Sequence, residues 1–189
     1  MENYFRTFIG LPFSVKAEFL EARQDLIASL PDERISWVDP ERYHVTLRFL
    51  GDTEQSLIGK IGNSLAAGIT LPERTSLKLN GLGSFGPEKR PRVLWIGFEE
   101  SGLFELMKSQ VDQALKSCGI FPVEQPFRAH LTLGRIRSLK NLQRYNRTVE
   151  EMHQEFKSSV VFDKLVFFRS ILSSRGPEYQ VLKALHFRE

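Results

Sequence analysis

Two histidines in this chain begin the same short motif, which pairs an imidazole with a hydroxyl. His44 begins His-Val-Thr-Leu and His130 begins His-Leu-Thr-Leu, although the whole sequence contains only four histidines. Side chains alternate between the two faces of a β-strand, so each histidine shares a face with the threonine two residues later, Thr46 or Thr132. Two such strands on opposite sides of one cleft would present two imidazoles and two hydroxyls to a bound group.

These residue types favour acid–base chemistry on a phosphate. An imidazole has an ordinary pKa of about 6.5, so near neutral pH one histidine can accept a proton while another donates one. Each role typically contributes roughly 10²–10⁴ to a reaction rate, and threonine hydroxyls can donate to phosphoryl oxygens as charge builds there. Beside the two motifs we find no carboxylate or third histidine at metal-ligand spacing. The pair therefore predicts catalysis without a metal; a two-histidine metal site and buried core histidines are the alternatives.

Arginine is the second chemical signal. Residues 125–149 contain no aspartate or glutamate. The basic residues of this stretch are Arg128, Arg135, Arg137, Lys140, Arg144 and Arg147. Strict alternation would point Arg135 away from His130, but Gly134 could permit a β-bulge that turns it back, where a guanidinium would hold a phosphate with two hydrogen bonds. The first motif has Phe49 at the corresponding position, a candidate for stacking on a base or for the core.

The remaining reactive residues have weaker contexts. Residues 89–92, Lys-Arg-Pro-Arg, form a smaller basic cluster that could contact an RNA backbone or be a solvated loop. His153 and His186 lie in no comparable motif, so we interpret them as structural or surface residues. Cys118 is the only cysteine, which excludes an intrachain disulfide, indicates a reducing compartment and predicts a small buried side chain.

Bulk composition is that of an ordinary globular protein. The 189 residues are 41% hydrophobic and 26% charged, and the net charge of +3 is too small to define a nucleic-acid binder. The first residues lack the basic and apolar regions of a signal peptide, and no stretch is long enough to span a bilayer. We therefore expect a cytoplasmic protein with one core or with two small lobes that share a cleft.

Hydrophobic periodicity predicts the elements that must position the motifs. Strands are expected at residues 4–11, 43–50, 77–82, 93–98, 130–136, 160–172 and 179–187, with a turn at 173–177. Helices are expected at residues 13–30, from an Asp52 or Thr53 cap to 67, 103–118 and 141–156. One histidine strand falls in each half of this order. The pattern predicts a single α+β domain over residues 1–189, duplicated with pseudo-twofold symmetry.

Several segments together resemble the 2H phosphoesterases, in the branch called RNA 2′,3′-cyclic phosphodiesterases or 2′-5′ RNA ligases. The matching segments are residues 6–12, 37–51, 82–86, 92–95, 127–135, 170–172 and 176–179. They occur in order over nearly the whole chain. One departure is Ala129, where members of the family usually have proline before the second histidine.

The resemblance implies a bilobed fold with two antiparallel sheets, flanking helices and a central cleft lined by the histidine strands. It also implies hydrolysis of RNA 2′,3′-cyclic phosphate ends, such as those of tRNA halves, to 2′-phosphates by a monomer without cofactors. We expect His130 to activate water and His44 to protonate the departing 3′ oxygen, although the pseudo-symmetry permits the reverse. Thr46, Thr132 and Arg135 would hold the phosphate, and the reverse reaction would be 2′-5′ RNA ligation.

Two other functions are compatible with the sequence. One is a phosphodiesterase acting on a small nucleotide, such as ADP-ribose cyclic phosphate or a 2′-5′ oligoadenylate. The other is a non-catalytic RNA-binding module that keeps the fold. Both histidine motifs are intact, which favours an enzyme.

Overall fold

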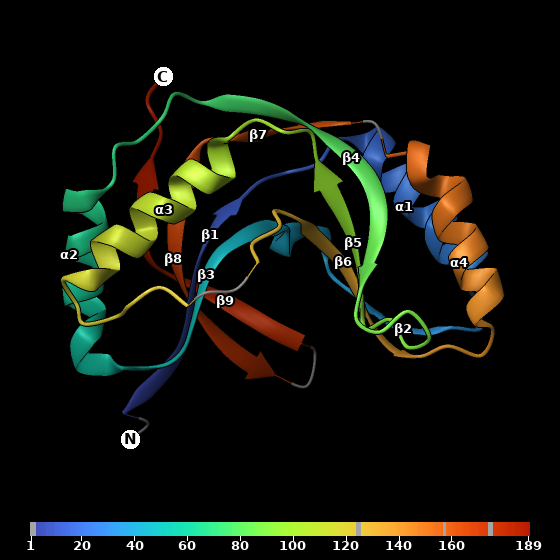
Figure 1. Cartoon of the computed structure of the whole chain (residues 1–189), viewed down its shortest axis with the longest axis horizontal. Coiled ribbons are helices and arrows are strands. Elements are labelled where there is room, and N and C mark those ends of the chain that lie inside the picture. Colours follow the sequence, from blue (N-terminus) through green and yellow to red (C-terminus); the bar gives the residue numbers. More distant parts are fainter. Residues whose placement is uncertain (1–2, 124–125, 157, 174–175) are drawn as a thin grey trace.

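The chain folds around a strongly curved antiparallel sheet with a pair of helices at each end (Figure 1). The computed structural model describes residues 3–123, 126–156, 158–173 and 176–189. Its strands are β1 (Tyr4–Pro12), β2 (Arg34–Trp37), β3 (His44–Glu54), β4 (Thr75–Phe85), β5 (Val93–Phe98), β6 (Leu131–Ser138), β7 (Ser159–Phe162), β8 (Lys164–Ser173) and β9 (Gly176–His186). Its α-helices are α1 (Ala17–Ser29), α2 (Ile58–Gly68), α3 (Leu103–Lys116) and α4 (Leu142–Glu151), and single 3₁₀ turns follow at Pro40–Arg42, Gln55–Leu57 and Met152–Gln154.

The sheet consists of two matching halves. The strand order is β7-β4-β5-β6-β3-β1-β8-β9, with β2 paired to the free side of β6. The two histidine strands, β3 and β6, lie at the centre and meet through the antiparallel pair Val45 and Leu131. Outward from this junction the strands β1, β8 and β9 correspond to β5, β4 and β7. The predicted duplicated α+β fold is confirmed, and the two expected sheets are the halves of one sheet joined at this pair.

Helices cover the convex side of each half. Figure 1 shows α2 and α3 at one end of the molecule and α1 and α4 at the other. Helix α3 packs on β3 and α2, and its buried residues recur every three or four positions, as in an amphipathic helix. They include Phe104, Met107, Val111 and Leu115. This packing fixes the back of β3 while its other face is left for the cleft.

The first histidine strand is longer than its sequence indicates. It was expected to end before Gly51 and to be followed by a helix capped by Asp52 or Thr53, but β3 continues to Glu54 and α2 begins only at Ile58. The reason is that Gly51 adopts a φ of +73° at a register shift against β1, so the strand passes through a bulge instead of ending. Beyond it the Thr53 hydroxyl hydrogen-bonds to the Thr7 hydroxyl at 2.7 Å.

Two further expectations are corrected. Strand β2 lies in a segment interpreted as a polar connection, because its four residues are too few to show a clear alternation. The single strand expected at 160–172 is two strands, β7 and β8, separated at Asp163. The turn expected at 173–177 joins β8 to β9, and its residues 174–175 lie outside the described residues, as does residue 125 of the basic stretch. Within the described ranges, every helix is too short or too polar to cross a membrane.

Candidate active site

A cleft of about 500 Å³ lies over the centre of the sheet, where β3 and β6 meet. It brings together all five residues expected to hold or cleave a phosphate: His44, Thr46, His130, Thr132 and Arg135. They come from β3, from β6 and from His130 immediately before β6, and the two histidines are 86 positions apart in sequence (130 − 44). The fold therefore converts two copies of one short motif into a single site.

The two histidines are held in the same way. The Nδ1–H of His44 donates to the carbonyl oxygen of Arg42 at 2.8 Å, and the Nδ1–H of His130 donates to the carbonyl oxygen of Arg128 at 2.7 Å. A carbonyl oxygen only accepts, so Nδ1 carries the hydrogen in both rings. In each neutral ring Nε2 is then the basic nitrogen, and it is the nitrogen left for the cleft. Each ring can accept a proton there when neutral and donate one when protonated.

A bulge follows the threonine in both strands. Against β1, residues Thr46 and Arg48 of β3 pair with successive residues, so Leu47 is extra. Against β5, Thr132 and Gly134 of β6 also pair with successive residues, so Leu133 is the extra residue there. The extra residue reverses the alternation, which brings Arg135 to the face that carries Thr132.

Gly134 is required by the strand beside it. A Cβ atom at this position would lie 2.6 Å from Cγ2 of Ile35 and 3.3 Å from the Trp37 ring, both on β2. The bulge that glycine was expected to permit is therefore present, and the missing side chain also lets β2 approach β6 closely. As a result Arg135 lines the cleft together with both histidines.

Aromatic rings fix the orientation of each imidazole. The His44 ring packs against Phe8, at 4.8 Å between centroids, and against Tyr179, which meets it edge-on at 5.2 Å. The His130 ring meets Phe85 edge-on at 4.8 Å, and Trp95 lies behind Phe85. Such packing restricts rotation of the rings and keeps them aimed at the cleft.

Burial and nearby cations lower the pKa of both histidines. For His44 the largest cause is burial, and the charges of His130 and Arg135 act in the same direction. For His130 the largest cause is again burial, followed by Arg128 and Arg135. The hydrogen bonds to the carbonyls of Arg42 and Arg128 oppose these shifts. Without a bound anion, burial and these cations favour the neutral form of both rings, whereas a phosphate between the rings would favour protonation of one.

The cleft is also lined by residues that were not among the expected site residues, including Trp37, Arg42, Arg137 and Tyr179. Burial raises the pKa of the Tyr179 hydroxyl, so it remains a neutral hydrogen-bond donor. Trp37 and Tyr179 lie in segments that resemble the 2H phosphoesterases, and this resemblance was the one sequence feature that could have indicated a role in the site. Their place in the cleft depends on β2 and on the β8–β9 hairpin, which no local pattern connects to the histidines.

The other singled-out residues lie elsewhere. Phe49 is not among the residues that line the cleft; its ring is 52% exposed and lies under the Arg6 guanidinium at 4.9 Å. Base stacking by Phe49 therefore has no support from this geometry. His153 hydrogen-bonds to the Leu82 carbonyl, and Cys118 is buried.

Carboxylates are scarce at the site. Among the described residues that line the cleft, only Asp39 is acidic, and its Oδ1 accepts a hydrogen bond from the backbone N–H of Glu41 at 3.0 Å. Among the residues that the structure describes, no three histidine, cysteine, aspartate or glutamate side chains gather as a candidate metal site. The cleft therefore offers imidazole, hydroxyl and guanidinium groups to a ligand.

Comparison with known proteins assigns the chain to a class, the phosphoesterases. The model of the LigT-like phosphoesterase family matches residues 9–95 and 98–179. Two relatives described as RNA 2′,3′-cyclic phosphodiesterases are similar to the chain. The one from Aquifex aeolicus is 38% identical over 160 residues, which are 79% of this chain and 80% of that protein. The one from Aeropyrum pernix is 35% identical over 146 residues, or 77% and 82% of the two chains.

The chain therefore belongs to the LigT-like family of 2H phosphoesterases, and it is an enzyme. A solved structure, described as E. coli LigT complexed with 3′-AMP, shares the fold. Its TM-score is 0.75 at 20% identity, with 98% of this chain and 99% of that chain covered. This likeness agrees with the bilobed arrangement of the sheet.

Proposed function

We propose that this enzyme hydrolyses RNA 2′,3′-cyclic phosphate ends to 2′-phosphates without a metal, by acid–base catalysis with two histidines. The observation that carries the proposal is the matched pair of Nδ1–carbonyl hydrogen bonds. They leave one basic nitrogen of each ring for the same cleft. A reaction that takes a proton on one side of phosphorus and gives one on the other needs this arrangement.

His130 serves as the base and His44 as the acid. Nε2 of His130 takes a proton from water as the water oxygen attacks phosphorus, and protonated His44 gives its Nε2 proton to O3′ as the P–O3′ bond breaks. His130 is the less deeply buried ring, which favours access of water.

Thr46, Thr132 and Arg135 hold the phosphate. The two hydroxyls and the guanidinium line the cleft with the histidines, and each can donate to a non-bridging oxygen. Negative charge on these oxygens grows during attack, so donors fixed in advance stabilise the transition state more than the substrate. Trp37 and Tyr179 provide aromatic surfaces in the same cleft for the terminal base.

Ligation uses the same groups. Neutral His130 takes the proton of a 5′ hydroxyl, in place of water, as its oxygen attacks phosphorus, and protonated His44 gives its proton to O3′ as the P–O3′ bond breaks. The product would be a 2′-5′ linkage. Incubation of a cyclic-phosphate RNA and a 5′-hydroxyl RNA at high concentration should yield a ligated product that His44→Ala does not form.

The decisive test is an assay in EDTA. The protein is incubated with a short RNA that ends in a 2′,3′-cyclic phosphate, and the terminal phosphate is identified by mass and by its resistance to a 3′-phosphatase. We expect a 2′-phosphate at an unchanged rate in EDTA. Turnover that requires an added metal, or a 3′-phosphate product, would contradict the proposed mechanism.

A further inference from the structure

We propose that Arg137 binds the phosphodiester immediately 5′ of the terminal nucleotide, so the natural substrate is an oligonucleotide rather than a single nucleotide. This inference rests on the proposed function, because it extends the same cleft along the RNA chain. A mononucleotide cyclic phosphate has only one phosphate, and in the proposed complex this phosphate binds to Arg135 and the two histidines. Any second phosphate contact therefore distinguishes the two substrate classes.

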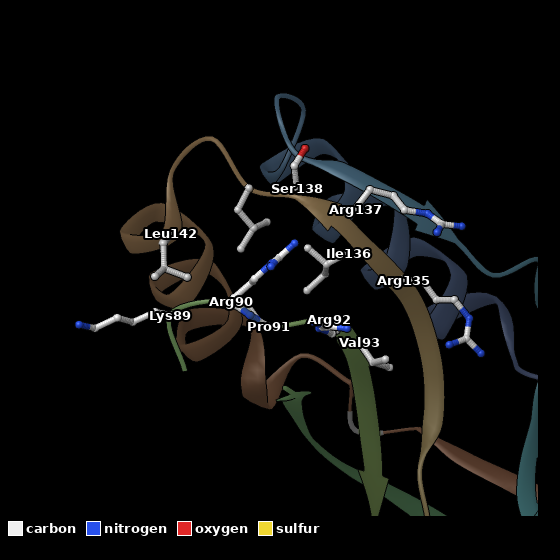
Figure 2. Close-up of a pocket in the computed structure, with 11 residues that line it drawn as sticks. Lys89, Arg90, Pro91, Arg92, Val93, Arg135, Ile136, Arg137, Ser138 and Leu142 are labelled. Carbon is white, nitrogen blue, oxygen red and sulfur yellow. The ribbon is translucent and has the colours of Figure 1, made fainter. Parts of the chain in front are cut away.

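Arg137 lies at the right place along β6. It lines the same cleft as His44 and His130. It is two residues beyond Arg135, and alternate residues of a strand share a face about 7 Å apart. Figure 2 shows the side chains of Arg135 and Arg137 on one side of β6 and that of Ile136 on the other. In extended RNA, two successive phosphates can therefore reach the two guanidinium groups.

The Arg137 side chain is positioned but not neutralised. Its Nε donates to the Ser36 hydroxyl at 3.1 Å, a contact that β2 makes from the neighbouring strand. Over the described ranges, no carboxylate forms a salt bridge with Arg135 or Arg137. A fixed guanidinium without an acidic partner keeps its full charge for a phosphate.

Positive charge continues on the other side of β6, where the loop before β5 lies beside residues 135 and 136. A second hollow of about 610 Å³ is lined by Arg135 and Arg137 and by the basic loop residues Lys89, Arg90 and Arg92 (Figure 2). Glu88 precedes this loop cluster in sequence but does not line the hollow. Phosphates farther from the RNA end therefore meet a second set of cations once the chain passes Arg137.

Substrates of increasing length separate these contacts. Wild type, Arg137→Gln and a Lys89→Gln/Arg90→Gln double variant are assayed with a uridine 2′,3′-cyclic phosphate, a dinucleotide and an octanucleotide with the same end. The control is Arg147→Gln, a side chain on α4 that is exposed and paired with Glu151. Arg137→Lys tests whether charge alone suffices.

Each variant should affect one range of lengths. Arg137→Gln should raise the KM of the dinucleotide and octanucleotide about tenfold and leave the mononucleotide unchanged, with partial recovery in Arg137→Lys. The double variant should affect only the octanucleotide. For this substrate the slope of log(kcat/KM) against log salt should become shallower by about 0.7 for each lost contact.

Two results would overturn the inference. One is an equal loss on the mononucleotide and the dinucleotide in Arg137→Gln; the other is a wild-type KM that does not fall from mononucleotide to dinucleotide. Failure of the proposed function is distinguishable, because wild type would then release a 2′-phosphate from none of the three substrates.

Discussion

The two histidine motifs present the same imidazole group in different surroundings. In β3 the residue after the bulge is Arg48, which faces away from the cleft, forms an ion pair with Asp112 and donates to the Phe121 carbonyl. In β6 the equivalent residue is Gly134, which lets β2 approach. One copy therefore uses this position to hold the segment before the second histidine, and the other uses it to widen the sheet.

The next position differs as well. Phe49 lies under Arg6 outside the cleft lining, whereas Arg135 lines the cleft. The backbone geometry is duplicated, but the guanidinium of the proposed phosphate site, Arg135, comes from only one half. In the proposed mechanism, the duplication accounts for the acid–base pair, and the residues after the bulge account for how a substrate is oriented.

The largest effects are expected when each histidine is removed in turn, which tests whether the two motifs contribute equally to catalysis. His44→Ala and His130→Ala should each lower kcat by about 10²–10⁴, since each removes one proton-transfer group. A cyclic phosphate with sulfur in place of O3′ distinguishes the roles, because a thiolate leaves without an acid. His44→Ala should regain activity on this substrate and His130→Ala should not; the opposite pattern would exchange the two roles.

Substitutions at Phe49 and Arg135 test whether the two halves differ in substrate binding. Arg135→Gln should lower kcat/KM about 10- to 100-fold, because it removes charge-assisted hydrogen bonds to the phosphate. Phe49→Ala should leave kcat/KM nearly unchanged. A comparable loss in both variants, with circular dichroism showing folded protein, would mean that both halves clamp the substrate.

Glycine at the second bulge sets the distance between β2 and β6. Gly134→Ala should destabilise the protein by about 1–3 kcal/mol, because the added methyl overlaps Ile35 unless β2 moves. The matched control is Gly59→Ala in α2, where nothing lies within 4 Å of the new Cβ and helix propensity favours alanine. Chemical denaturation of both variants measures the free energy of unfolding. Equal values for the two variants would show that the contact with β2 does not require glycine at position 134.

The pH dependence should reflect the shared cations. Activity needs one protonated and one neutral histidine, and both pKa values of the free enzyme are lowered, so the maximum of kcat/KM should fall below pH 6.5. A bound phosphate raises the pKa of the acid, so the profile of kcat should extend to higher pH. Arg135→Gln removes a cation near both rings and should shift the kcat/KM maximum upward. A maximum that stays in place would exclude this electrostatic coupling.

Much of this site could be predicted from local sequence, but not all of it. The alternation around His44 and His130 sufficed to pair each imidazole with its threonine, and a glycine was enough to suggest the bulge before Arg135. Trp37 and Tyr179 could not be assigned to the cleft, because their positions depend on strand pairings between distant segments. The same limit explains why β2 was not predicted: it is a short strand, and its paired residues are 97 and 99 positions away in sequence (Trp37 with Gly134, and Ser36 with Arg135).

The central pairing of β3 with β6 resembles the interface of a symmetric dimer within one polypeptide. A twofold contact between identical subunits would place the same strand on both sides of its axis, and any site on that axis would receive one residue from each. Here each half supplies one histidine, so neither half alone holds a complete acid–base pair. Joining the halves in one chain lets the two sides of the axis change independently, as Phe49 and Arg135 have done, while the paired imidazoles keep their common geometry.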